Sequence, residues 1–353
     1  MNDVHALSDQ DLADRLTFLE EVGSGNWGSV WKCRIKNGSE GDIVAVKLVH
    51  RSGGSNLKTS AARVRSLWNE MKTVRSFTQQ AHAQSATSHP AIVPFSAFVI
   101  TPSYALIEMP FFPRLVPVEV RESKARHWFR ALADGVLFLH ARGVVHNDIK
   151  PANILLTHAD TPVLVDFGFA HRYDPTRRED AFISRLSYGT PEYLSPERAK
   201  GTPHDTRKSD VWALGVTFFE ILEGRTPFER SDLSDSGGEV MATKEDLERY
   251  LARTVTGRWV GEWRLSPEVE RLLRRMMAPT PSERATITSV VTDAYFAEPT
   301  PAPTPVPTPA PVSRTPKATN KAKAKAKAKS LVLNLGQPLG MYLQLSAVVA
   351  ICY

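Results

Sequence analysis

The chain has 353 residues, of which 42% are hydrophobic, so it can bury a large core. Its formal net charge of +6 is concentrated near the C-terminus, because residues 299–353 contain seven Lys and Arg residues and no acidic residue, which leaves 37 basic against 38 acidic residues before them. The remainder of the chain is therefore near neutral, and we do not expect the folded part to bind nucleic acid.

The first predicted element is a hairpin with a glycine-rich turn, between strands at 19–22 and 31–35. The turn and the residue after it fit the pattern G-x-G-x-x-G-x-V through Gly23, Gly25, Gly28 and Val30. Glycine lets a backbone approach phosphate groups closely and adopts positive φ without a Cβ penalty. A dinucleotide-binding fingerprint shares these glycines but requires a helix after the loop. Because both flanks here look like strands, we disfavour that alternative.

A lysine, Lys47, interrupts the next predicted strand, the apolar run 43–49. A buried ammonium group needs a partner, and Glu70 is a candidate. This glutamate lies in a predicted amphipathic helix at 61–80, where apolar residues recur at three- and four-residue spacing: Val64, Leu67, Trp68, Met71 and Val74. We expect the flanking segments 51–60 and 79–88 to be loops.

Two polar motifs follow a second predicted helix, whose apolar face comprises Ala125, Trp128, Phe129, Leu132, Val136 and Leu139. The first motif, at 146–156, reads HNDIKPANILL, and the second is Asp166-Phe167-Gly168 after a predicted strand at 162–165. Each polar residue alone could belong to an ordinary turn. Two motifs in this order are much harder to attribute to coincidence.

Together these motifs resemble the eukaryotic protein kinase family, of the serine/threonine type. The resemblance implies an α+β fold in two lobes over residues 16–297. A small β-rich lobe with one main helix would occupy about 16–108, and a larger, mainly helical lobe about 111–297. ATP would bind in the cleft between them.

The resemblance also implies catalytic roles for three residues. Asp148 would accept the proton of the substrate hydroxyl, Lys150 would contact the transferred phosphate, and Thr190 would hydrogen-bond near both. Asn153 and Asp166 would hold Mg²⁺, since amide and carboxylate oxygens suit this hard cation.

The cofactor site would combine several parts of the small lobe with one residue after the catalytic loop. Lys47 would pair with Glu70, and the three glycines would cover the phosphates. The remaining predicted contacts, which sandwich the adenine or form the hinge, are Val30, Ala45, Ile107, Glu108, Met109 and Leu155. Pro110 lacks an N–H where most kinases offer a donor to adenine, so we expect ATP binding to be weaker by about 0.5–1.5 kcal/mol.

Two departures from the family pattern concern regulation. Asn147 stands where an arginine is usual, and Leu186 stands at the usual phosphorylation site. We therefore expect activity without activation-loop phosphorylation. The resemblance also implies that Asp210 holds the backbone of the catalytic loop and that Glu197 pairs with Arg284.

The C-terminal residues do not fit the kinase pattern. We expect 298–329 to be a disordered linker, first rich in Pro, Thr and Ala and then in Lys and Ala. The uncharged tail 330–353 is either disordered, packed, or an artefact of the gene model; alternatively 331–353 anchors the chain in a membrane. Cys33 and Cys352 form no CxxC pair, and no signal peptide is recognisable, so we expect a cytoplasmic or nuclear protein.

The sequence thus predicts a monomeric serine/threonine protein kinase that transfers the γ-phosphate of ATP to protein hydroxyls. One alternative is a pseudokinase that binds nucleotide without turnover. Another, an adaptor that binds nucleic acid or membrane through its basic tail, accounts only for the C-terminal residues.

Overall fold

The computed structural model describes residues 4–25, 28–36, 42–51, 57–78, 88–174, 179–229 and 244–297. Residues 1–297 form one compact unit. The expected linker at 298–329 and the expected tail at 330–353 lie outside the described residues. Among the helices that are described, none is long and apolar enough to cross a membrane.

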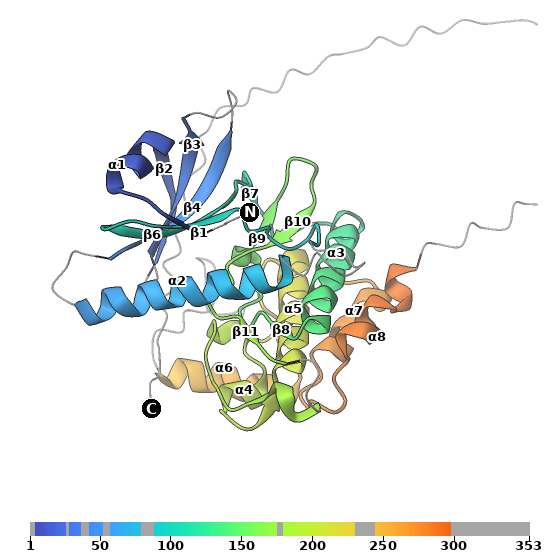
Figure 1. Ribbon diagram of the computed structural model, residues 1–353. Coiled ribbons are helices and arrows are strands. Elements are labelled where there is room, and N and C mark those ends of the chain that lie inside the picture. The colour runs from blue at the N-terminus through green and yellow to red at the C-terminus, as the bar shows by residue number, and fades with distance from the viewer. Residues whose placement is uncertain are drawn as a thin grey trace, which may run out of the picture. The chain divides into compact units, whose positions relative to one another are not determined.

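The small lobe is built on a six-stranded sheet (Figure 1). In spatial order its strands are β1 (Val4–Ala6), β5 (Ala97–Ile100), β6 (Tyr104–Pro110), β4 (Ile43–His50), β3 (Gly28–Ile35) and β2 (Leu16–Gly25). Only β1 and β5 pair in parallel. Because side chains alternate along a strand, β4 directs Val46 and Leu48 into one apolar cluster and Val49 into another.

Helix α1 (Asp9–Arg15) lies before the predicted start of the domain at residue 16. Its first turn is fixed by a capping box, in which the Ser8 hydroxyl accepts from Asp11 N and the Asp11 carboxylate accepts from Ser8 N, both at 3.0 Å. Leu12 of α1 is buried in the same cluster as Val46. The folded unit therefore includes residues that the kinase motifs do not cover.

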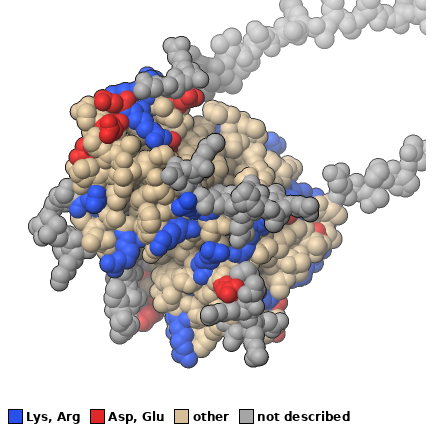
Figure 2. Space-filling view, in the orientation of Figure 1, with Lys and Arg blue, Asp and Glu red and all other residues tan. Residues whose placement is uncertain are grey.

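Helix α2 (Leu57–Thr78) packs against the sheet through Leu67 and Met71. It begins four residues earlier than predicted, so 57–60 are helical and not part of a loop. Figure 2 shows basic side chains across the middle of one face, where α2 lies. This helix contains five Lys and Arg residues, whereas its only acidic residue, Glu70, is buried.

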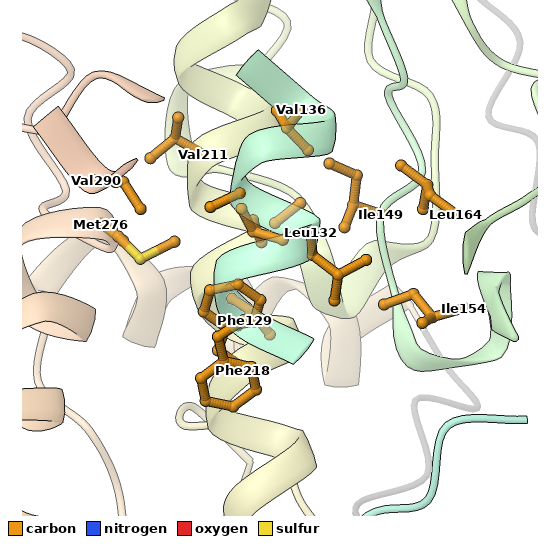
Figure 3. Close-up of a cluster of buried hydrophobic side chains, with 14 of the residues drawn as sticks. Phe129, Leu132, Val136, Ile149, Ile154, Leu164, Val211, Phe218, Met276 and Val290 are labelled. Atoms are coloured by element: carbon orange, nitrogen blue, oxygen red, sulfur yellow. The ribbon is translucent and has the colours of Figure 1, made fainter. Parts of the chain in front are cut away.

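The large lobe is mainly helical and surrounds one core (Figure 3). Its helices are α3 (Glu122–Ala141), α4 (Pro196–Ala199), α5 (Thr206–Glu223), α6 (Lys244–Thr256), α7 (Pro267–Met276) and α8 (Ile287–Val291). The apolar face predicted for α3 is confirmed, since all six of its residues are buried. Phe129 of α3 stacks on Phe218 of α5 with the ring centroids 4.0 Å apart.

Short strands in the large lobe hold the polar motifs in place. They pair as β7 (Arg114–Leu115) with β9 (Ile154–Leu156) and β9 with β10 (Pro162–Leu164), β8 (Val144–Val145) with β11 (His171–Arg172), and β12 (Ile183–Ser184) with β13 (His204–Asp205). The motif at 146–153 consequently spans the gap between β8 and β9, and Asp166 follows β10.

Candidate active site

The Asp210 carboxylate of α5 accepts hydrogen bonds from the backbone of the loop at 146–153. Its Oδ2 accepts a hydrogen bond from His146 N at 2.9 Å, and its Oδ1 accepts one from Asn147 N at 2.8 Å. His140 Nε2 lies 2.9 Å from the same carboxylate. Burial alone would raise the pKa of Asp210, but the hydrogen bond and charge of His140 lower it below its ordinary value. The predicted anchoring of this loop is thus confirmed.

Asp148 is the centre of a compact polar network. Its Oδ1 accepts from Thr190 N at 3.1 Å and from Thr190 Oγ1 at 2.8 Å. Its Oδ2 lies 3.0 Å from both Lys150 Nζ and Asn153 Nδ2. Lys150 also donates to Thr190 Oγ1 at 2.5 Å. The structure therefore brings together the three predicted catalytic residues and one predicted metal ligand.

A second network joins the lobes through Lys47. Its Nζ lies 2.7 Å from Glu70 Oε2 and 2.8 Å from Asp166 Oδ1, which confirms the predicted ion pair and adds a third member. Burial alone would lower the pKa of Lys47, but the two carboxylates raise it above its ordinary value. Burial would likewise raise the pKa of Asp166, yet Lys47 lowers it to about 2. Lys47 and Asp166 can therefore contribute fixed charges to the cleft, whereas burial raises the pKa of Glu70 in spite of its pairing with Lys47.

The predicted metal ligands have suitable chemistry and orientation. Asn153 directs Nδ2 toward Asp148, donating to its backbone carbonyl at 2.8 Å, so its amide oxygen is directed away. Asp166 directs one oxygen toward Lys47, and its side chain remains 44% exposed. The two residues are held near each other because Val165 N donates to Asn153 O at 2.9 Å. One amide oxygen and one carboxylate fit a Mg²⁺ ion that keeps water or phosphate oxygens as its other ligands.

The glycine-rich turn joins β2 to β3, which pair as far as Gly25 and Gly28; residues 26–27 lie outside the described part. Gly28 has φ +127°, and a Cβ there would lie 2.4 Å from the Leu48 carbonyl oxygen. The sheet itself therefore requires this glycine. A Cβ on Gly23 would meet only the Val30 side chain, at 3.9 Å, so the sheet does not require that glycine.

The other predicted cofactor contacts lie on four strands, β3, β4, β6 and β9. Val30 of β3 is opposite Lys47, Ala45 of β4 is opposite Met109, and Leu155 is on β9 in the large lobe. Met109 and Ile107 both line a small cavity that Asp166 and Phe167 also line.

Glu108 makes contacts that the sequence did not predict. Its side chain points to the other face of β6, where it forms an ion pair with Arg15 at 2.7 Å, and its carbonyl oxygen accepts from Ser96 N at 3.1 Å. The side chain is thus engaged within the small lobe, whereas the carbonyl oxygen keeps a second lone pair as an acceptor. Ile107 is opposite Lys47 in the sheet and lies in one apolar cluster with Leu67 and Met71 of α2, which places it at the back of the cleft. The weaker ATP binding expected from Pro110 stays a prediction.

The substrate side is fixed by a buried arginine. Arg284 donates to both oxygens of Glu197, at 2.6 and 2.9 Å, which confirms the predicted pair. Sequence reasoning missed two other arginines near the site, Arg15 and Arg198. No local pattern distinguishes them from surface arginines; only their partners, distant in the chain, reveal their positions.

Residues 16–296 of the chain match a family model that is described as "Protein kinase domain". The chain belongs to the protein kinase family. Its six-stranded sheet and helical lobe are the two lobes of that fold, which confirms the fold prediction.

Curated relatives of this kinase are of the serine/threonine type. Serine/threonine-protein kinase SRK2D of Arabidopsis thaliana is 29% identical over 82% of this chain and 73% of its own length. CBL-interacting serine/threonine-protein kinase 15 of the same plant is 28% identical over 78% and 59%, respectively. Serine/threonine-protein kinase pkn2 of Myxococcus xanthus is 29% identical over 81% of this chain but only 33% of its own length. The kinase described here is accordingly a protein kinase of the serine/threonine type. It matches only part of the length of some of its relatives.

Proposed function

We propose that this kinase is catalytically active and transfers the γ-phosphate of Mg-ATP to serine or threonine hydroxyls of protein substrates. The observation that carries the proposal is the closed network around Asp148, with Lys150 and Thr190 in hydrogen-bond contact. Phosphoryl transfer needs positioned groups and charge stabilisation more than covalent chemistry. These residues supply both at one point of the cleft.

Each side chain has a definite task in this proposal. The Asp148 carboxylate accepts the proton of the attacking hydroxyl, and Thr190 holds that carboxylate in orientation. Lys150 and Lys47 place positive charge beside the phosphates. Asn153 and Asp166 would hold Mg²⁺, which would supply positive charge to the phosphate oxygens.

The alternative, a pseudokinase, keeps the fold but lacks turnover. Lys47 forms ion pairs with both Glu70 and Asp166, and the presence of all three residues in contact favours the active enzyme. The test incubates the purified full chain with Mg-ATP and mixed protein acceptors and compares it with Asp148→Ala. Removing a general base typically lowers rates by about 10²- to 10⁴-fold. Asp134→Ala is the matched control, because Asp134 lies on the surface of α3 and pairs with Arg130. ATP binding without transfer by the wild type would support the pseudokinase.

We further propose that activity does not require activation-loop phosphorylation. Leu186 has no hydroxyl and is 52% exposed, and Asn147 carries no charge for a phosphate to neutralise. Phosphatase treatment is therefore expected to leave the rate of transfer unchanged. Mass spectrometry showing that activity follows phosphate at Ser184, Ser187 or Tyr188 would contradict this proposal.

A further inference from the structure

A buried arginine lies next to the catalytic loop and comes from a different segment. Arg198, in α4, is 3% exposed. It donates from Nη1 to Asn147 Oδ1 at 2.8 Å, and its guanidinium carbon is 4.8 Å from the ring centroid of Tyr188. Its Nε has no hydrogen-bond partner among the residues described. The buried cation thus depends on Asn147 and on the tyrosine ring for its direct contacts.

Asn147 uses both ends of its amide. Its Oδ1 accepts from Arg198, while Nδ2 donates to the Phe169 carbonyl oxygen at 3.1 Å and lies 3.4 Å from the Tyr188 hydroxyl. The rings of Phe169 and Tyr188 stack with their centroids 5.7 Å apart. Asn147 also has φ +69°, which asparagine tolerates better than most residues. The Asn147 amide therefore joins the catalytic loop to α4, to Phe169 and to Tyr188. The last two residues belong to the segment between Asp166-Phe167-Gly168 and Thr190, which we call the activation segment.

The contacts of this amide explain why an asparagine is present. An aspartate could accept from Arg198 but could not donate to Phe169 O. An arginine could not accept from Arg198, and it would place a second cation beside a buried one, which is unfavourable. The arginine that is usual in the family and Arg198 are therefore incompatible in this chain.

We propose that Arg198 is a positioning residue that, through Asn147, holds the catalytic loop against the activation segment without a phosphate. The proposal rests on the phosphotransferase activity proposed above. Asn147 immediately precedes Asp148, and Tyr188 lies two residues before Thr190, whose N–H and hydroxyl both bond Asp148. Loss of the Arg198 contact would misalign Asp148 and Thr190. The contacts of Lys47 in the ATP cleft lie outside this link, so kcat should fall while KM for ATP changes little.

A double-mutant cycle on the full chain tests the proposal. The variants are Asn147→Arg, Arg198→Met and the two combined, with kcat, KM for ATP and unfolding temperature measured for each. Arg126→Met is the matched control, because Arg126 of α3 also lies over a tyrosine ring, at 4.5 Å from Tyr295. We expect the control to keep its rate within about two-fold, the usual result for a surface substitution.

Non-additivity is the decisive outcome. Arg198→Met is expected to lower kcat by about ten-fold or more with KM for ATP little changed, and Asn147→Arg should lower kcat by a similar factor. Because both substitutions break the same contact, the double variant should be no slower than the slower single variant. If Arg198 only supports folding, Arg198→Met will lower the unfolding temperature and leave kcat near the wild-type value. That result, or multiplied losses of kcat in the double variant, would overturn the inference while leaving the proposed activity intact. An inactive wild type would overturn both.

Discussion

Replacing Arg284 with methionine should test how the large lobe supports the substrate side of the cleft. The side chain is fully buried and donates to both carboxylate oxygens of Glu197. It also donates to the backbone carbonyl oxygens of Ala278, Lys208 and Pro279, at 2.9, 3.1 and 3.2 Å. Methionine would fill much of the space but satisfy none of these acceptors.

The expected loss of stability follows from what remains buried. Without Arg284, the Glu197 carboxylate stays 9% exposed and has lost its cation. Removing one partner of a buried ion pair typically costs about 3–5 kcal/mol. For a domain near this size each kcal/mol lowers the unfolding temperature by about 2–4 °C, so we expect a decrease of about 6–20 °C.

Thermal unfolding followed by circular dichroism at pH 7 measures this decrease. Arg274→Met is the control, because Arg274 is 44% exposed and its pair with Glu270 is worth about 1 kcal/mol or less. The double variant Glu197→Gln, Arg284→Met should recover part of the loss, since it no longer buries an unpaired charge. If Arg284→Met unfolds within about 2 °C of the wild type, the assigned cost of the unpaired carboxylate is wrong.

Two further substitutions test the electrostatics and the glycine-rich turn. Burial raises the pKa of Glu220 from its ordinary 4.5 to about 7. The folded protein therefore keeps a proton that the unfolded chain releases, and stability falls as pH rises between these values. Glu220→Gln should accordingly raise the unfolding temperature more at pH 8 than at pH 5; equal shifts would refute this sign. Gly28→Ala should cost about 1–3 kcal/mol in urea unfolding, because φ is +127° and the new Cβ would clash with Leu48 O, whereas Gly23→Ala should unfold like the wild type.

Both ion pairs of the site could be predicted only with the help of the family resemblance. A lysine in an apolar strand needs a carboxylate, and the helical period made Glu70 a candidate, but the kinase pattern decided in favour of the pair of Lys47 and Glu70. The pair of Glu197 and Arg284 lies 87 residues apart in sequence. No local pattern links such residues, and only the resemblance to the kinase family joined them.

Two arginines mark the limit of sequence reasoning. Arg15 pairs with the side chain of Glu108, which it reaches from a helix 93 residues earlier in the chain. No local pattern predicts a contact between residues so far apart. Arg198 was missed for a similar reason. Arg198 follows the charged residue Glu197 in the sequence, and an arginine in such a position usually lies on the surface. The burial of Arg198 depends on its contact with the amide of Asn147.

The strand before α1 has a practical consequence for work with this kinase. The family match begins at residue 16, whereas β1 covers the outer side of β5 and Arg15 neutralises Glu108. A recombinant fragment cut at the family boundary would leave β5 as an open edge, a surface on which other chains can add as strands. Such a fragment would be prone to aggregate. Its low yield and activity would then reflect a misplaced boundary and could be mistaken for a defect of the catalytic site.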